Sequence, residues 1–239
     1  MKKVSIFIFL SFLFSAILIT GCKKDDDQPS QNATKYNDKT VTIPDAMSQS
    51  NDPGAQMAVA YINMVNGMTS YSAMMTPPGK SSIMHYKDDG ETYTWEVDDT
   101  SGKYTVTLKI WKSDYKTVWE LYVTGTLDGH QLVNFKYIDA FQQNDGTGGS
   151  LVVYDFDSGN WYMDITWTDD GDGNINLTFT VFEETKLHIA VYSDGSGSLE
   201  YSEWDGGAFI VTYKAQWESS GHGQWWMYES GVTTNQGLW

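Results

Sequence analysis

Residues 161–181 read WYMDITWTDDGDGNINLTFTV, and this stretch decides the fold class. Apolar side chains occupy alternate positions on both sides of a central polar segment: Trp161, Met163, Ile165 and Trp167, then Ile175, Leu177, Phe179 and Val181. Such a period of two is typical of a strand with one buried face, and Asp-Gly sequences favour the positive φ angles of tight hairpins. The stretch therefore predicts two antiparallel strands joined by a turn.

The same alternation recurs over most of the chain after residue 82, for example in residues 92–97, 104–110, 187–191 and 209–217. Turn clusters separate the alternating segments: residues 88–90, 101–102, 128–129, 144–146, 157–160, 169–174, 183–184, 193–195, 205–207 and 219–221. No helical segment long enough for a crossover lies between them, so neighbouring strands must be antiparallel. We predict a mainly β fold: an up-and-down meander of about eleven strands that forms a curved sheet or open barrel.

One N-terminal helix is predicted to pack on this sheet. Asp52 is a suitable N-cap and Pro53 suits the first helical position. The helical spacing of Met57, Tyr61, Met64, Val65 and Met68 places them on one face. This methionine-rich face has two interpretations, plain packing against the sheet or an adaptable lining for an apolar ligand.

The apolar-ligand hypothesis assigns a groove between helix and sheet. Its candidate ligand-binding residues are Met57, Tyr61, Met64 and Met68 on the helix and Trp95, Trp119, Trp161 and Trp167 on the strands. A helix followed by a curled antiparallel meander resembles the lipoprotein-carrier fold of the Lol proteins in architecture alone. That resemblance implies an apolar groove and carries over no functional residue.

The N-terminal segment predicts an export sequence. Lys2 and Lys3 precede an apolar run over residues 4–19, which is short for a membrane span, and Thr20, Gly21 and Cys22 follow. This ending resembles the lipobox of bacterial lipoproteins. The resemblance implies cleavage before Cys22, a diacylglycerol on its thiol and acylation of its amine, so the membrane is an expected partner. Because Cys22 is the only cysteine, an intrachain disulfide is excluded.

Residues 23–32 read KKDDDQPSQN, which is typical of a flexible polar tether. The charged run after Cys22 resembles the export signal of Bacteroidota surface lipoproteins, which implies anchorage in the outer membrane and display at the cell surface. The alternative is a linker that only keeps the domain off the bilayer. We predict a signal peptide over residues 1–21, a lipidated cysteine and tether over 22–51, and one domain over 52–239.

The charge balance limits the partners. The 239 residues carry a formal net charge of −16, which would repel nucleic acid and anionic head groups. Aromatic residues make up 15% of the chain, a composition that argues against disorder. We therefore expect a folded extracytoplasmic domain that binds no nucleic acid.

The sequence contains no recognisable motif for catalysis, metal binding or cofactor binding. The histidines at positions 85, 130, 188 and 222 lie far apart, and no nucleophile elbow or phosphate-binding loop occurs. Asp170, Asp172 and Asn174 match the start of a calcium loop, but Ile175 and Val181 stand where that loop needs glycine and glutamate. We expect a hairpin turn there, no cofactor and no enzymatic activity.

Aromatic residues on the polar side of the strands support a second hypothesis. They are Tyr122, Tyr137, Tyr162, Tyr192 and Trp204. Aromatic ring faces beside carboxylates and amides suit carbohydrate, while cross-strand pairing that stiffens the sheet is the plain alternative. The leading expectation is a lipid-anchored binding domain for a hydrophobic ligand. The alternatives are glycan binding, a structural or accessory subunit of an envelope complex, and a hydrolase that uses dispersed carboxylates.

Overall fold

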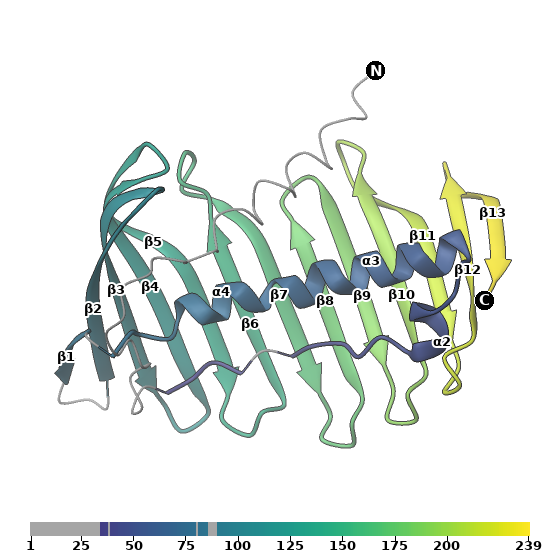
Figure 1. Ribbon diagram of the computed structural model, residues 1–239, viewed down its shortest axis with the longest axis horizontal. Helices are drawn as coiled ribbons and strands as arrows, with labels where there is room; N and C mark the ends of the chain where they lie inside the picture. The colour runs from purple at the N-terminus through teal and green to yellow at the C-terminus, as the bar shows by residue number, and fades with distance from the viewer. Residues whose placement is uncertain (1–33, 38, 80, 86–89) are drawn as a thin grey trace.

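The computed structural model describes residues 34–239 apart from residues 38, 80 and 86–89. Its main element is a single sheet of thirteen strands, in which each strand pairs antiparallel with the next one along the chain. The strands are β1 (Ser82–His85), β2 (Gly90–Asp99), β3 (Gly102–Lys112), β4 (Lys116–Leu127), β5 (His130–Gln143), β6 (Gly148–Tyr154), β7 (Trp161–Asp169), β8 (Ile175–Val181), β9 (Thr185–Val191), β10 (Gly197–Trp204), β11 (Phe209–Trp217), β12 (Gly223–Glu229) and β13 (Val232–Leu238). The predicted mainly β meander is confirmed as an open, curved sheet with β1 and β13 at its edges (Figure 1).

The sheet has two strands more than the predicted number of about eleven. One turn outside the predicted clusters joins β3 to β4, where the Ser113 amide donates to the Lys116 carbonyl at 2.8 Å and no glycine is needed. The other joins β12 to β13 through Ser230 and Gly231, which have φ angles of 51° and 79°. Paired positive φ angles are typical of a tight hairpin turn, so a single Ser-Gly pair is sufficient to reverse the chain here.

In the described part of the chain, three helices precede the sheet: α2 (Asp45–Ser48), α3 (Pro53–Gly67) and α4 (Thr69–Met74). The predicted start of the long helix is confirmed, because the Asp52 carboxylate accepts hydrogen bonds from the Gly54 and Ala55 amides at 2.8 and 3.1 Å. In Figure 1, α3 and α4 run across the strands on one face of the sheet, from β12 toward β5. We call this covered side the helix face and the other side the open face.

The closest approach of helix and sheet occurs at Gly54. A Cβ atom at this position would lie 2.2 Å from the Trp225 ring of β12. The Gly54 carbonyl also accepts a hydrogen bond of 2.7 Å from the buried Tyr213 hydroxyl of β11. The first turn of α3 is therefore held against the last strands of the sheet because it has no side chain there.

The most buried line of α3 differs from the predicted methionine face. Its buried residues are Gly54, Ala55, Ala58, Ile62 and Val65. Met57, Tyr61, Met64 and Met68 are half-buried and pack against the core along one side of this line. The line begins with the small residues Gly54, Ala55 and Ala58 because a helix that crosses a sheet must approach it closely, and the longer side chains of the methionine face fill the space beside it.

The chain before the helices also covers the helix face. We call residues 34–43 the N-terminal strap. Within it Tyr36 and Val41 are buried in the core, and Met47 of α2 is fully buried. The packed part of the chain thus begins well before residue 52, where the domain was predicted to start. Residues 40–43 run as a non-strand segment.

Two kinds of contact hold the strap to its neighbours. The side chain of Asn66 on α3 hydrogen-bonds both backbone groups of Val41, accepting from its amide at 2.9 Å and donating to its carbonyl at 2.8 Å. Lys39 pairs with Asp169 at the end of β7 at 2.7 Å. The strap is therefore bonded to the helix on one side and to the sheet on the other.

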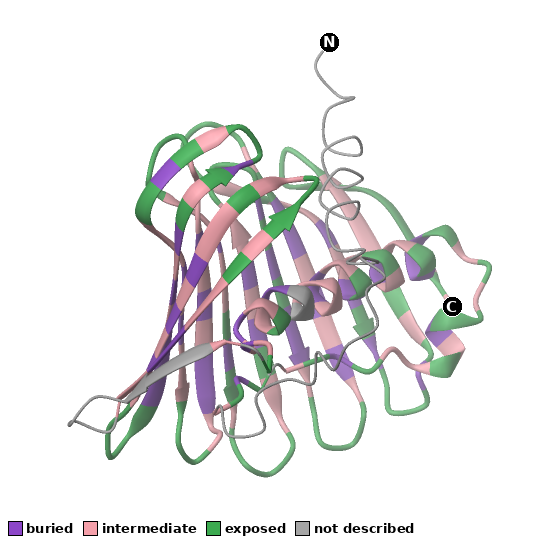
Figure 2. Ribbon diagram, turned by 60° about the vertical axis from the view of Figure 1, so that its left-hand side comes forward, coloured by how far each residue is buried: buried purple, intermediate pink, exposed green. Residues whose placement is uncertain are grey.

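Alternation of burial along the strands confirms the predicted period. In Figure 2 buried and more exposed positions alternate along the central strands. Leu121 of β4, Leu177 of β8 and Leu187 of β9 are buried on the helix face. The core is therefore one layer between the sheet and its cover, while the open face meets solvent.

Substituting Gly54 by alanine should destabilise the fold. The new methyl group would overlap the Trp225 ring, and overpacking of this kind costs about 1–3 kcal/mol. Urea unfolding followed by tryptophan fluorescence measures the loss. Ala60→Ser, at an exposed position of the same helix, is the matched control and should change stability by less than about 0.5 kcal/mol. A Gly54→Ala variant as stable as the control would contradict the close approach.

Asn66→Ala should loosen the strap. The substitution leaves the Val41 amide and carbonyl without their partners, at a cost of about 1–2 kcal/mol. Hydrogen exchange should become faster in residues 39–43 and stay unchanged in β8 and β9. Asn63→Ala, at an exposed position one turn earlier on α3, should leave the strap protected. Equal exchange in both variants would show that Asn66 does not hold the strap.

Candidate functional site

The predicted apolar groove is occupied by contacts within the chain. The Tyr61 ring stacks on Tyr201 with 4.2 Å between centroids. The Trp119 indole donates to the Thr34 carbonyl at 3.0 Å, and Tyr36 meets its ring edge-on at 5.3 Å. These contacts use the ring surfaces that a hydrophobic ligand would need.

The strap also covers the predicted site residue Trp167. Its indole nitrogen lies 3.4 Å from the Tyr36 hydroxyl, and Lys39 lies over its ring at 5.2 Å from the centroid. Trp95 on β2 is half-buried and packs against the same core. Helix, strap and sheet therefore bring seven of the eight predicted residues to one core: Met57, Tyr61, Met64, Met68, Trp95, Trp119 and Trp167.

Trp161 is the exception, and a β-bulge explains it. Tyr162 is an extra residue in the pairing of β6 with β7, since Val153 pairs with Met163 and Tyr154 with Trp161. The bulge reverses the alternation, so Tyr162 packs against the core, while Trp161 meets Phe182 edge-on at 5.0 Å.

A second bulge corrects another sequence-based assignment. Tyr137 is the extra residue where β4 pairs with β5, because Leu121 pairs with Ile138 and Tyr122 with Lys136. Tyr137 packs against the core, and burial raises its pKa to about 12. Of the five aromatic residues predicted on the polar side, Tyr137 and Tyr162 thus belong to the helix face.

A hollow of about 640 Å³ lies where the β3–β4 and β5–β6 hairpins adjoin. We call it the hairpin hollow. Its lining residues are Asp114, Tyr115, Lys116, Phe141, Gln143, Asn144 and Asp145. Its volume lies within the range of small-molecule sites in proteins, and it combines aromatic, amide and charged groups.

Asn144 fixes the two hairpins relative to each other. Its side-chain amide donates to the Ser113 carbonyl at 2.8 Å, and its side-chain oxygen accepts from the Thr117 hydroxyl at 3.1 Å. Its backbone amide donates to the Tyr115 carbonyl at 2.9 Å. One asparagine therefore holds the β3–β4 turn from three directions, and the walls of the hollow are organised before any ligand arrives.

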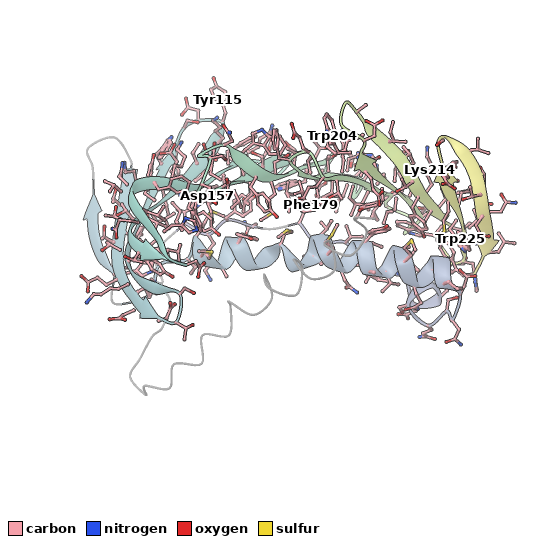
Figure 3. All side chains as sticks on the ribbon, turned by 90° about the horizontal axis from the view of Figure 1, so that it is seen from above. Tyr115, Asp157, Phe179, Trp204, Lys214 and Trp225 are labelled. Atoms are coloured by element: carbon pink, nitrogen blue, oxygen red, sulfur yellow. The ribbon has the colours of Figure 1, made fainter. Side chains whose placement is uncertain are left out.

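Two aromatic rings form the apolar part of the hollow. Tyr115 is 82% exposed, and Figure 3 shows it projecting on the side of the sheet opposite α3. Phe141 is half-buried on the open face, where it pairs with Val118. The Lys116 ammonium lies 5.1 Å from the Phe141 ring centroid. The Tyr115 ring therefore offers a solvent-facing aromatic surface on which the apolar face of a ligand can pack.

The carboxylate of Asp145 is held in place by its own turn. It accepts from the Thr147 amide at 2.9 Å and from the Thr147 hydroxyl at 2.7 Å. These two hydrogen bonds lower the pKa of Asp145. The Thr147 hydroxyl also contacts the Gln143 side-chain oxygen. Asp145 is therefore an ionised, oriented acceptor at neutral pH.

The sequence contained a weak indication of this hollow. Tyr115 stands alone among polar residues in the segment Ser113-Asp114-Tyr115-Lys116, which has no glycine to mark a turn. Residues 144–146 were recognised as a turn, but only the pairing of Lys116 with Gln143 brings the two turns together. The site depends on the register between β4 and β5. The alternating pattern within each strand does not specify that register.

The described part of the chain has no cluster of three or more His, Cys, Asp or Glu side chains arranged to hold a metal ion. Asp170 closes the β7–β8 turn by accepting from the Asp172 and Asn174 amides at 2.9 and 3.1 Å, so the expected hairpin turn is confirmed. Among the described residues, no helix has the length and apolar character needed to cross a bilayer. Cys22 and the predicted signal peptide lie outside the described residues.

The chain matches no protein-family model and no curated protein. Its function must therefore be argued from its own residues. The hairpin hollow is a described feature in which exposed aromatic, amide and carboxylate groups converge.

Asn144→Ala should loosen the β3–β4 turn without unfolding the sheet. Loss of two side-chain hydrogen bonds at a solvent-exposed turn should cost about 1–2 kcal/mol in urea unfolding. Hydrogen exchange should rise at the turn that contains Tyr115. Asn160→Ala, at an exposed position of the β6–β7 turn, is the control and should affect neither quantity. Unchanged exchange near Tyr115 would contradict the role of Asn144.

Proposed function

We propose that this chain is a lipid-anchored, non-enzymatic domain that binds carbohydrate at the cell surface through the hairpin hollow. The observation that carries the proposal is the 82% exposed Tyr115 ring beside Phe141 and an oriented amide and carboxylate set in one hollow. The proposed anchor is Cys22, with the polar tether presenting the domain outside the outer membrane.

The lining suits a sugar because a sugar has two kinds of surface. The C–H face of a pyranose ring is apolar and packs on an aromatic ring such as Tyr115. Its hydroxyl groups both donate and accept hydrogen bonds, which Asp145 and Gln143 satisfy as acceptors and Lys116 as a donor. An apolar ligand would displace water from these polar groups and offer them no hydrogen bond in return.

The charges of the hollow and of the whole chain limit the class of sugar that can bind. The hollow contains two carboxylates, Asp114 and Asp145, and one ammonium, Lys116, which is already over the Phe141 ring. The whole chain has a net charge of −16. Acidic sugars and sulfated glycans would be repelled, so the proposed ligand is a neutral carbohydrate.

The hydrophobic-ligand hypothesis has less support. Its predicted residues are engaged by the strap and by helix packing, as the Tyr61–Tyr201 stack and the Trp119–Thr34 bond illustrate. A ligand on that face would have to displace these contacts. The hairpin hollow needs no such rearrangement because Tyr115 already faces solvent.

Tyr115→Ala should weaken carbohydrate binding by about tenfold or more, which corresponds to about 1.4 kcal/mol of binding free energy. The full chain, purified in a detergent without a sugar head group, is first screened on an array of neutral glycans. Isothermal titration with a glycan from that screen then compares the variant with the wild-type protein.

Tyr192→Ala is the matched control, since Tyr192 is 50% exposed at a different hairpin end. It should bind as tightly as the wild-type chain. An array that stays silent while circular dichroism shows a folded β protein would refute the proposal. Equal losses in both tyrosine variants would move the site away from the hairpin hollow.

A further inference from the structure

The open face carries a line of small polar side chains that begins at the hairpin hollow. Phe141 of β5 pairs with Ser150 of β6, Ser150 with Thr166 of β7, and Thr166 with Thr178 of β8. Residues that pair directly across antiparallel strands lie on the same face of a sheet. We call Ser150, Thr166 and Thr178 the hydroxyl file. Their neighbours Leu151, Trp167 and Leu177 are buried on the helix face, so the file faces away from α3.

A second line of small residues lies beside the hydroxyl file, toward the same hairpin end. Gly148 pairs with Thr168, Thr168 with Asn176, and Asn176 with Ala190. Two adjacent lines are separated by two residues along each strand, which is about 7 Å. Together they form a low strip, wide enough for one sugar ring, that continues outward from the Phe141 ring.

The hydroxyl file leads through His188 to a charged pair, whereas the second line continues through the uncharged Ser198 and Gln216. Thr178 pairs with His188 of β9, and their side chains meet at 3.2 Å. His188 pairs with Glu200 of β10, which forms an ion pair of 2.7 Å with Lys214 of β11. From Phe141 to His188 the path crosses four strand spacings, or about 19 Å.

We infer that the ligand of the hairpin hollow is a linear neutral polysaccharide, which continues from Tyr115 and Phe141 along the hydroxyl file. This inference rests on the proposed carbohydrate function and specifies its ligand. An extended pyranose chain advances by nearly one strand spacing per sugar, so each hydroxyl of the file meets one successive unit. The footprint before the Glu200–Lys214 pair is about five sugars.

The composition of the strip favours carbohydrate over other chain molecules. Serine and threonine hydroxyls both donate and accept, as sugar hydroxyls do, and they rise little above the sheet. A polyanion is excluded by the net charge of −16. The continuity of the strip with the Phe141 ring gives the chain a fixed starting point in the hollow.

The length of the oligosaccharide is the variable that tests the proposed path along the hydroxyl file. Isothermal titration of the full chain, in a detergent without a sugar head group, is run with purified linear oligosaccharides of increasing length from one neutral polymer that binds. Affinity should rise by at least about tenfold between two units and about five, because each added unit meets another strand at a spacing of about 4.8 Å. Beyond that length it should level off.

Thr166→Arg places a long side chain across the strip. It should remove the gain for long chains and leave the affinity for the shortest oligosaccharide within about twofold, because the hollow is untouched. Thr126→Arg, at an exposed position near the opposite end of β4, should keep the full length dependence. This pair separates a blocked path from a general effect of added charge.

Each result decides one question. Binding of short chains without any gain with length, or a gain that Thr166→Arg does not remove, overturns the polysaccharide path and leaves the proposed function standing. Absence of binding at every length, with a folded protein, overturns both. A gain with length that only Thr166→Arg abolishes supports the path.

Discussion

The whole structure depends on covering one apolar face of a single-layer sheet. Thirteen strands in one open sheet present an apolar surface that no second sheet covers in the described part of the chain. Burial of that surface provides most of the stabilisation, because each large apolar side chain removed from water contributes about 1.5–3 kcal/mol. A long helix that runs across the strands reaches many of them at once. It does so only because Gly54 allows contact with Trp225 and because the strap fills the remaining width.

Helix and strap form one cover, bonded to each other as well as to the sheet. The Asn66 bonds to Val41 link them, and Tyr36 of the strap reaches both Trp119 of β4 and Trp167 of β7. These two strands are separated by β5 and β6, so the strap bridges the curved sheet from its helix face. Because the strap lies far in sequence from β4 and β7, bringing them together costs conformational entropy of the chain. Once formed, the contacts make the strap part of the core.

Sequence analysis predicted the sheet well and its cover only in part. Alternation and turn residues are local, so the meander, the Asp52 cap and the long helix followed directly from the pattern. The strap did not, because residues 34–43 have no period and their burial comes from tertiary contacts of Tyr36 and Val41. The two bulges at Tyr137 and Tyr162 were likewise unpredictable, since a single inserted residue reverses which face a side chain occupies. The hairpin hollow was missed for a related reason, since its two turns are brought together by strand register.

A single-layer sheet separates stability from recognition. The helix face must be apolar and filled, so its residues are constrained by packing, whereas the open face is free to vary as long as it remains soluble. Solubility alone would be served by charged side chains on every strand, yet the chain with a net charge of −16 places Ser150, Thr166 and Thr178 in an unbroken uncharged line. Along this line the charged groups resume at Glu200 and Lys214, while the neighbouring line on the same face carries Asp139, Asp164 and Lys186. Threonine is also common on exposed strand faces because of its β-propensity, so the proposed ligand path rests on the continuity of this strip with the exposed Tyr115 and the oriented Asp145 carboxylate at its start.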